Sequence, residues 1–259
     1  ANTTGGQNTA FGTEALKENT TASNNTAVGY QAGYDNTTGY SLTAIGRDAA
    51  HENTSGIHNT AVGHASLYTN TTGGYNTAIG RDALNSNTTG SYSTAVGYQS
   101  GLNSTANFNT SVGANSLKTT TTGLSNTAIG TSSMFHSTTG SYNTAIGEEA
   151  LVSNTTASHN TAVGHQAGRT NTTGSYNTFV GRKAGYTCNN TGNVFNAFFG
   201  QSAGYACTTG FNNTYIGTNA GDLITTGHDN TILGRYNGNQ GGLDIRTGSN
   251  NIVLSDGDG

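Results

Sequence analysis

The sequence predicts an all-β fold, a parallel β-solenoid of about fourteen coils with roughly seventeen residues each. Three observations predict it. A five-residue phrase returns at a fixed interval, a large apolar residue stands just before the end of each phrase, and a turn phrase fills the other half of the interval. We expect the repetitive solenoid over residues 1–234, and an irregular C-terminal coil or cap with a tail over residues 235–259.

The phrase is N-T-A-(V/I)-G, with variants. Its final glycines are Gly12, Gly29, Gly46, Gly63, Gly80, Gly97, Gly113, Gly130, Gly147, Gly164, Gly181, Gly200, Gly217 and Gly234. The steps between them are equal, except that the step into Gly113 is shorter by one position and the step into Gly200 is longer by two. A fixed period of this length is the signature of a repeat architecture, in which each unit packs only against its neighbours.

The residue before each of these glycines is always large and apolar, and most are β-branched, which favours a strand. We expect this position to be the core column of the solenoid. Its typical members are Val28, Ile45, Val62, Ile79, Val96, Ile129, Ile146, Val163 and Val180.

The other half of each repeat carries Asn-Thr-Thr-Gly, a turn phrase, because Asn bonds local backbone and Gly tolerates positive φ. Each coil is then a strand, a corner at the glycine, a short second strand and a turn. Stacked coils place equal residues above one another about 4.8 Å apart. The asparagines seven residues after the glycine should form an amide ladder: Asn19, Asn36, Asn53, Asn70, Asn87, Asn154 and Asn171.

The two cysteines test this register. Cys188 and Cys207 each lie seven residues after a phrase glycine, in adjacent coils, so both occupy the column of the asparagine ladder. Stacking should bring their Cα atoms to about 5 Å, which is within the range of a disulfide. A bridge is expected if the protein is extracellular. The alternative is two small apolar residues that share one slot.

Composition limits the partners. The formal charge is −4, with 8% charged residues, so the chain has no basic footprint for nucleic acid. No apolar run is as long as a membrane span, and we expect no membrane insertion. The polar residues are uncharged Asn, Thr, Ser and Gly in strict order, which suits a solenoid better than a disordered chain.

Candidate catalytic and metal-binding groups are sparse, and we expect no enzyme activity, cofactor or metal. We expect the histidines to lie in solvent: His51, His58, His64, His136, His159, His165 and His228. Glu148 and Glu149 are adjacent, so as strand residues they would point to opposite faces. Asp48 and Asp82 each follow an arginine, which indicates a solvated charge column. A glycosidase needs two carboxyl groups that face one cleft. A polysaccharide-cleaving β-helix therefore stays the less favoured alternative.

The phrase N-T-A-(I/V)-G followed by a small residue resembles the head repeats of trimeric autotransporter adhesins, which form parallel β-rolls in homotrimers. It is also similar to phage tail-fibre repeats that precede a self-cleaving endosialidase-type chaperone domain. The run from Ser249 to Gly257 resembles the junction before that chaperone. The resemblance implies a secreted or virion-borne homotrimeric fibre.

We therefore expect a structural fibre or adhesin shaft, extracellular or on a virion surface. Its partners would be copies of itself, in a homotrimer or an end-to-end filament, and a cell-surface glycan or receptor. Aromatic residues ahead of the phrase either contact another chain or cover a loop of their own coil: Tyr75, Tyr92, Phe108, Tyr142, Tyr176, Phe195 and Phe211.

An ice-binding solenoid is the other alternative. An ice-type face should carry outward threonines at alternate strand positions. Thr37 and Thr38 are instead adjacent and lie in a turn, and Thr26 stands two residues before Val28, which we expect to be core. Both observations count against an ice-binding function.

Overall fold

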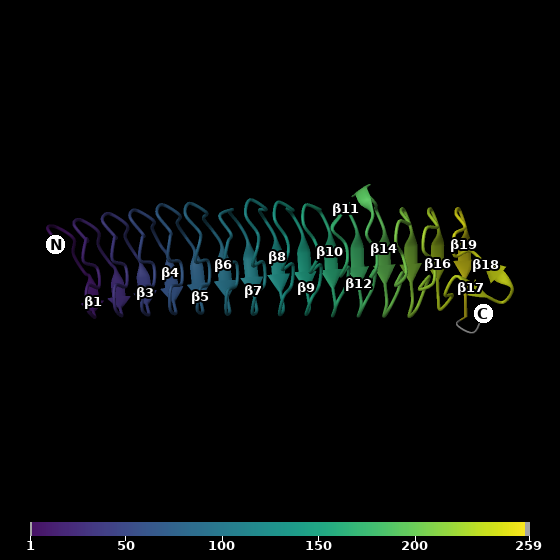
Figure 1. Cartoon of the computed structure of the whole chain (residues 1–259), viewed down its shortest axis with the longest axis horizontal. Coiled ribbons are helices and arrows are strands. Elements are labelled where there is room, and N and C mark those ends of the chain that lie inside the picture. The colour runs from purple at the N-terminus through teal and green to yellow at the C-terminus, as the bar shows by residue number, and fades with distance from the viewer. Residues whose placement is uncertain (1, 257–259) are drawn as a thin grey trace. The chain divides into compact units, whose positions relative to one another are not determined.

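The computed structural model describes residues 2–256 and is all-β, with no helix in that range. It is a parallel β-solenoid in which strands recur at a nearly constant interval, as from Thr43 to Thr60 (Figure 1). The chain divides into two compact units, residues 1–126 and residues 127–259. Each unit is a stack of coils in which every coil contributes one short strand to a parallel sheet.

The first unit contains seven strands, which pair in chain order. They are β1 (Thr9–Phe11), β2 (Thr26–Val28), β3 (Thr43–Ile45), β4 (Thr60–Val62), β5 (Thr77–Ile79), β6 (Thr94–Val96) and β7 (Thr110–Val112). Each strand pairs with the next at the same position of the repeat, as in Thr43↔Thr60 between β3 and β4. The one shorter step of the repeat is absorbed outside the strands, since Thr94 still pairs with Thr110.

The second unit repeats this arrangement with eight strands in its main sheet. They are β8 (Thr127–Ile129), β9 (Thr144–Ile146), β10 (Thr161–Val163), β12 (Thr178–Val180), β14 (Ala197–Phe199), β15 (Thr214–Ile216), β16 (Thr231–Leu233) and β19 (Ile252–Leu254). The longer step into Gly200 also keeps register, because Thr178 pairs with Ala197. The two extra residues therefore lie on the turn side of the coil.

Two further strand pairs interrupt the regular pattern of the second unit. A parallel pair joins β11 (Thr173–Ser175) to β13 (Thr191–Asn193), and an antiparallel hairpin joins β17 (Asn239–Gln240) to β18 (Leu243–Asp244). The hairpin is the irregular part of the predicted segment 235–259. The sheet itself continues past residue 234, since β19 pairs with β16 in register. Residues 257–259 of the predicted tail lie outside the described residues.

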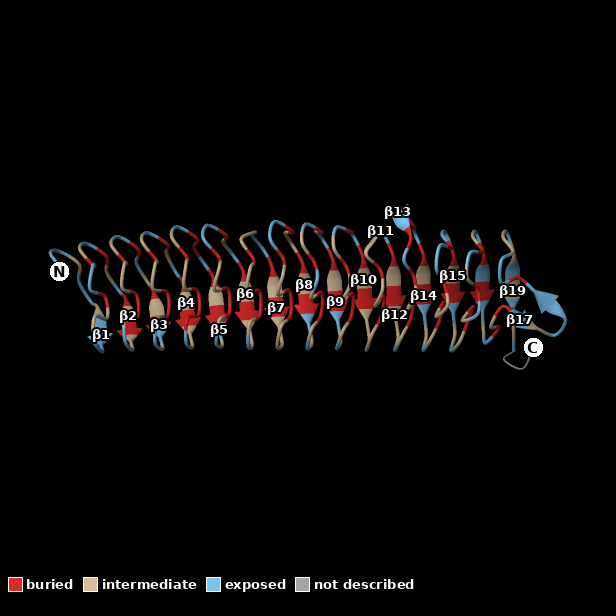
Figure 2. Ribbon diagram, viewed as in Figure 1, coloured by how far each residue is buried: buried red, intermediate tan, exposed pale blue. Residues whose placement is uncertain are grey.

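The predicted core column is wrong by one residue. Ile45 and Ile79 are each 40% exposed, Ile129 and Ile146 are each 37% exposed, and the valines of the column are half-buried. In most main-sheet strands the residue with no exposure is the middle one, and Figure 2 shows these strands with a red band. These middle residues form one interior column, whose members are Ala27, Ala44, Ala61, Ala78, Ala95, Ala128, Ala145, Ala162, Phe179, Phe198, Tyr215 and Ile232.

The physical reason is the alternation of side chains along a strand. Only one residue of each three-residue strand points inward, and in most copies that residue is alanine. The larger inward side chains come from the turn after the glycine instead. Leu67, Leu84 and Leu117 occupy this position four residues past the phrase glycine and are fully buried.

The two interior columns compensate for each other in size. In the second unit Phe198 and Tyr215 replace alanine in the strand column, and glycine then stands at the turn position of the same coil. A Cβ added at Gly204 would collide with the Phe198 ring, and one at Gly221 would collide with the Tyr215 ring. Close packing of this kind explains why the turn position alternates between leucine and glycine.

The backbone after each strand turns through left-handed residues. The phrase glycines have φ between 110° and 140°, as at Gly46 (132°) and Gly63 (131°), where the backbone of the next coil leaves no room for a Cβ. Non-glycine residues such as Glu14 and Leu16 follow with φ of 61° and 51°. The predicted second strand is therefore absent from the regular coils that the structure describes, because alternating left-handed residues cannot form a ladder.

Candidate functional site: the outward strand face

The outward side of each main-sheet strand presents two columns. The residue before the buried alanine is threonine in nearly every strand, and the residue after it is valine or isoleucine in most. Both point away from the interior, because the middle residue points into it. Thr77 and Ile79 of β5, for example, are half-buried and 40% exposed on either side of fully buried Ala78. We call this pair of columns the strand face.

The apolar column of the strand face varies in size but not in character. Phe199, Ile216 and Leu233 are its members in β14, β15 and β16, with exposures of 40%, 42% and 50%. The face is uncharged in every described main-sheet strand. A column of partly exposed and mostly aliphatic side chains is unusual on a monomeric soluble protein, where contiguous apolar patches mark contact sites.

Exposed aromatic rings form a further column beside the strand face, five residues before the phrase glycine, which we call the aromatic column. Within the first unit Tyr75 stacks on Tyr92 with 4.9 Å between ring centroids, and Tyr92 stacks on Phe108 at 5.4 Å. In the second unit Tyr176 stacks on Phe195 at 5.2 Å. The ring faces are thus covered by neighbouring coils of the same chain, while the side chains remain exposed.

Four histidines belong to ring stacks. His58 and His159 are exposed, as predicted, whereas His51 and His228 are half-buried. His58 stacks on Tyr75 at 4.8 Å, and His159 lies between Tyr142 and Tyr176 at 5.0 and 4.8 Å. His51 and His228 likewise stack on rings in adjacent coils. The signal was available, because each of these histidines stands one period away from an aromatic residue.

The predicted asparagine column lies inside the turn side of the coil. Its members Asn19, Asn36, Asn53, Asn70, Asn87, Asn154 and Asn171 are at most 1% exposed. Each Nδ2 donates to the carbonyl oxygen three residues on, which closes the turn, as from Asn36 to Gly39 at 2.8 Å. Amide-to-amide bonds link Asn36 to Asn53 (2.8 Å) and Asn53 to Asn70 (2.6 Å). The Oδ1 atoms of Asn154 and Asn171 are buried without a partner.

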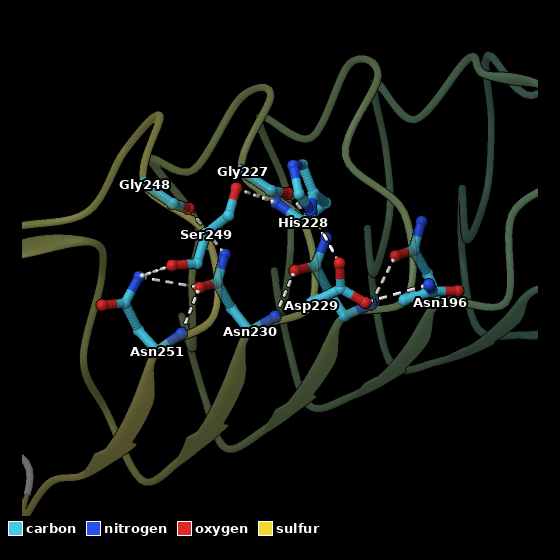
Figure 3. A network of polar contacts seen from close by, with 10 residues as sticks. Asn196, Gly227, His228, Asp229, Asn230, Gly248, Ser249 and Asn251 are labelled. Atoms are coloured by element: carbon cyan, nitrogen blue, oxygen red, sulfur yellow. Dashed lines mark hydrogen bonds and ion pairs between the residues drawn. The ribbon is translucent and has the colours of Figure 1, made fainter.

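A second amide column, four residues before the phrase glycine, is more continuous than the predicted one. The backbone N–H of Asn230 donates to Oδ1 of Asn213, and that of Asn251 donates to Oδ1 of Asn230, both at 3.0 Å. The side chain of Asn230 then donates to the carbonyl of Gly248 at 2.8 Å (Figure 3). Each amide thus bonds the backbone of the following coil, which ties successive coils together.

The two cysteines face each other in adjacent coils. Their Sγ atoms are 3.2 Å apart and are not joined by a disulfide, and each side chain is 1% exposed. A hydrogen bond to Cys207, together with burial, raises the pKa of the Cys188 thiol well above its ordinary value. The disulfide itself stays a prediction.

Several carboxylates form ion pairs with arginine. Asp48 lies 3.0 Å from the Nε of Arg47, and Asp82 lies 3.3 Å from that of Arg81. The pKa of Glu149 is lowered, first by the hydrogen bond from Arg169. Among the described residues Asp222 is the one carboxyl group whose pKa is raised, and burial is the cause.

Residues 2–256 contain no group of three His, Cys, Asp or Glu side chains arranged to hold a metal ion. No helix long and apolar enough to cross a membrane is found among them either.

Comparisons with protein-family models, with curated proteins and with solved structures give no match to this chain.

Proposed function

We propose that the protein is a self-assembling structural fibre, an extracellular or virion-associated spacer in which copies of the chain pack strand face against strand face. The observation that carries the proposal is the half-exposed aliphatic column of the strand face. A homotrimer around this column is the arrangement that we favour, and an end-to-end filament is the alternative.

A second copy of the same chain is the occupant that fits this face best. The face is uncharged, so it offers no electrostatic selectivity for a charged partner. It repeats with the spacing of the coils, and only another stack of equal spacing presents matching columns along its whole length.

The surface area of the strand face is too small for a stable interface, so we expect the contact to extend beyond it. Strands about 4.8 Å apart and about 10 Å long present roughly 340 Å² over the seven strands of the first unit. A standard protein interface covers about 800 Å² on each partner. The flanking exposed columns, which include Tyr92 and Tyr98, would then also take part.

Ice binding is a second candidate function for the same face. The sequence argument against it assumed that Val28 is core, and that assumption is wrong, since Thr26 and Val28 both point outward. The other argument holds, because the turn threonines are engaged, as in the bond from Thr37 Oγ1 to the Thr54 carbonyl at 3.0 Å. Phe199 and Leu233 also break the even surface that an ice lattice would need.

The two candidates are separated by two measurements on the purified chain. The fibre proposal expects discrete multimers in negative-stain images and no thermal hysteresis. Clear hysteresis from a monomeric chain would instead favour ice binding and would remove the support for self-assembly.

A further inference from the structure

The one coil with two extra residues differs from its neighbours on the turn side. Residues 191–193 form β13, which pairs with β11 and projects from the row of turns (Figure 2). A hollow of about 290 Å³ opens beside it, and its lining includes Asn190, Asn193, Val194 and Phe211. No charged side chain lines the hollow.

Phe211 lies beside the hollow and stands six residues before its phrase glycine, one residue outside the aromatic column. Phe211 stacks on His228 with 4.6 Å between centroids. On the side of the preceding coil Phe211 meets no stacked ring among the described residues, because buried Val194 stands at the equivalent position. Phe211 is 39% exposed. Phe211 also lines the hollow and is stacked by a ring on one side only, unlike Tyr92, which is stacked on both faces.

Three asparagine amides line the hollow beside this ring, and one buried amide oxygen among them has no partner. The Oδ1 of Asn190 is buried and accepts no hydrogen bond, while its Nδ2 donates to the Gly210 carbonyl at 2.7 Å. The exposed amide of Asn193 has no hydrogen-bond partner among the described residues. Asn189 is fixed, since its Oδ1 accepts from Thr172 Oγ1 at 2.6 Å, which leaves its Nδ2 to donate elsewhere. The lining thus combines donors and acceptors in one small area.

We propose that this hollow binds one pyranose unit of a neutral carbohydrate. The electron-rich face of Phe211 attracts the partly positive C–H groups on one face of a sugar ring. Hydroxyl groups at the rim of the sugar both donate and accept, which matches amides that do the same. An anionic sugar is disfavoured, because no lysine, arginine or histidine lines the hollow.

This inference deepens the proposed function and rests on it for its biological setting, since it names the ligand class through which a fibre would contact a surface. The binding chemistry needs only residues of the second unit. Assembly and sugar binding are therefore separate measurements, and either can fail without the other.

Saturation-transfer NMR on the intact chain tests the proposal. The probes are methyl β-glucopyranoside, methyl β-galactopyranoside and N-acetylglucosamine, with N-acetylneuraminic acid as the anionic comparison. We expect at least one neutral probe to bind, with transfer concentrated on the C–H protons of one sugar face. Phe211→Ala should weaken binding by roughly tenfold. Asn193→Ala should weaken it by a smaller factor, and the control Tyr92→Ala should leave it unchanged.

Three results would overturn the proposal: no transfer to any neutral probe, equal binding by the wild type and Phe211→Ala, or preferential binding of the anionic sugar. The sedimentation coefficients of the same variants serve as the assembly control. Phe211→Ala should keep the wild-type value, because Phe211 lies outside both the strand face and the aromatic column that flanks it.

Discussion

Ala162 and Val163 are neighbours in β10 that face opposite sides of the strand. Ala162 has no exposure, whereas Val163 is half-buried on the strand face. We expect Ala162→Asp to prevent folding, because an unpaired charge would be buried in the coil. Val163→Asp should fold with a wild-type circular dichroism spectrum. If Val163→Asp unfolds while Ala162→Asp folds, the inward and outward assignments are reversed.

The same pair shows why the inward strand residue could not be assigned from the sequence. Alternation predicts that one of two neighbouring strand positions is core, and size then favours valine over alanine. The structure reverses that preference, because the strand column and the turn column share the interior, and leucine at the turn position fills it in copies such as those of Leu67 and Leu84. The columns could be predicted from the period, but the side of the sheet on which each column lies depends on which other column supplies the large side chains of the interior.

Cys188 and Cys207 lie in register as the spacing predicts, and we expect them to form a disulfide on treatment with oxidised glutathione. Two thiols would lose two hydrogens, and glutathione disulfide would be reduced to two glutathione molecules. The raised pKa of Cys188 keeps the reactive thiolate scarce at neutral pH, so the rate should rise as the pH rises. Intact mass should fall by two hydrogens.

The bridge should stabilise the second unit by about 3 kcal/mol, the value for a closed loop of this size. Denaturant unfolding of the oxidised and reduced forms would measure this, with Cys188→Ser as the unbridged control. A mixed disulfide with glutathione, in place of the internal bridge, would contradict the register.

At the scale of the elements, the aromatic strands of the second unit test how the two interior columns compensate. Phe198→Ala should lower the free energy of unfolding by about 3–5 kcal/mol, because the substitution leaves a cavity in the interior. Gly204→Ala should also destabilise, because its methyl group would collide with the Phe198 ring and its φ is +61°. In the Phe198→Ala background that collision is gone, so the same change should cost only the left-handed backbone, about 1–2 kcal/mol.

Urea denaturation of the two single variants and the double variant completes this cycle. The double variant should be more stable than the sum of the two single losses predicts. Strictly additive losses would show that Phe198 and Gly204 do not share a space.

The strands and their register could be predicted from the sequence, because a β-branched phrase at a fixed interval specifies both. The repeat does not show whether the residues after the phrase glycine form a second strand or a left-handed turn. Gly33 and Leu67 occupy the same turn position with φ of 60° and 52°, and glycine and leucine together give no sequence signal for that conformation. The continuation into β19 was also missed, because the inserted hairpin lengthens the final step, which runs from Thr231 to Ile252.

At the scale of the whole molecule, the strand face is the feature that every described main-sheet coil shares. The hollow beside β13 could not be predicted, although the longer step into Gly200 marks its place. A longer step shows where the turn is extended, but the sequence does not show that Phe211 and the asparagines line a hollow there.

Sedimentation equilibrium of the intact chain and of the Ile79→Lys/Val163→Lys double variant tests the central claim most directly. The claim predicts a wild-type mass about three times the 26.3 kDa of one chain. The variant should have the mass of a single chain and an unchanged circular dichroism spectrum, because both lysines would lie on the strand face. A monomeric wild type, or a variant that assembles as the wild type does, would contradict it.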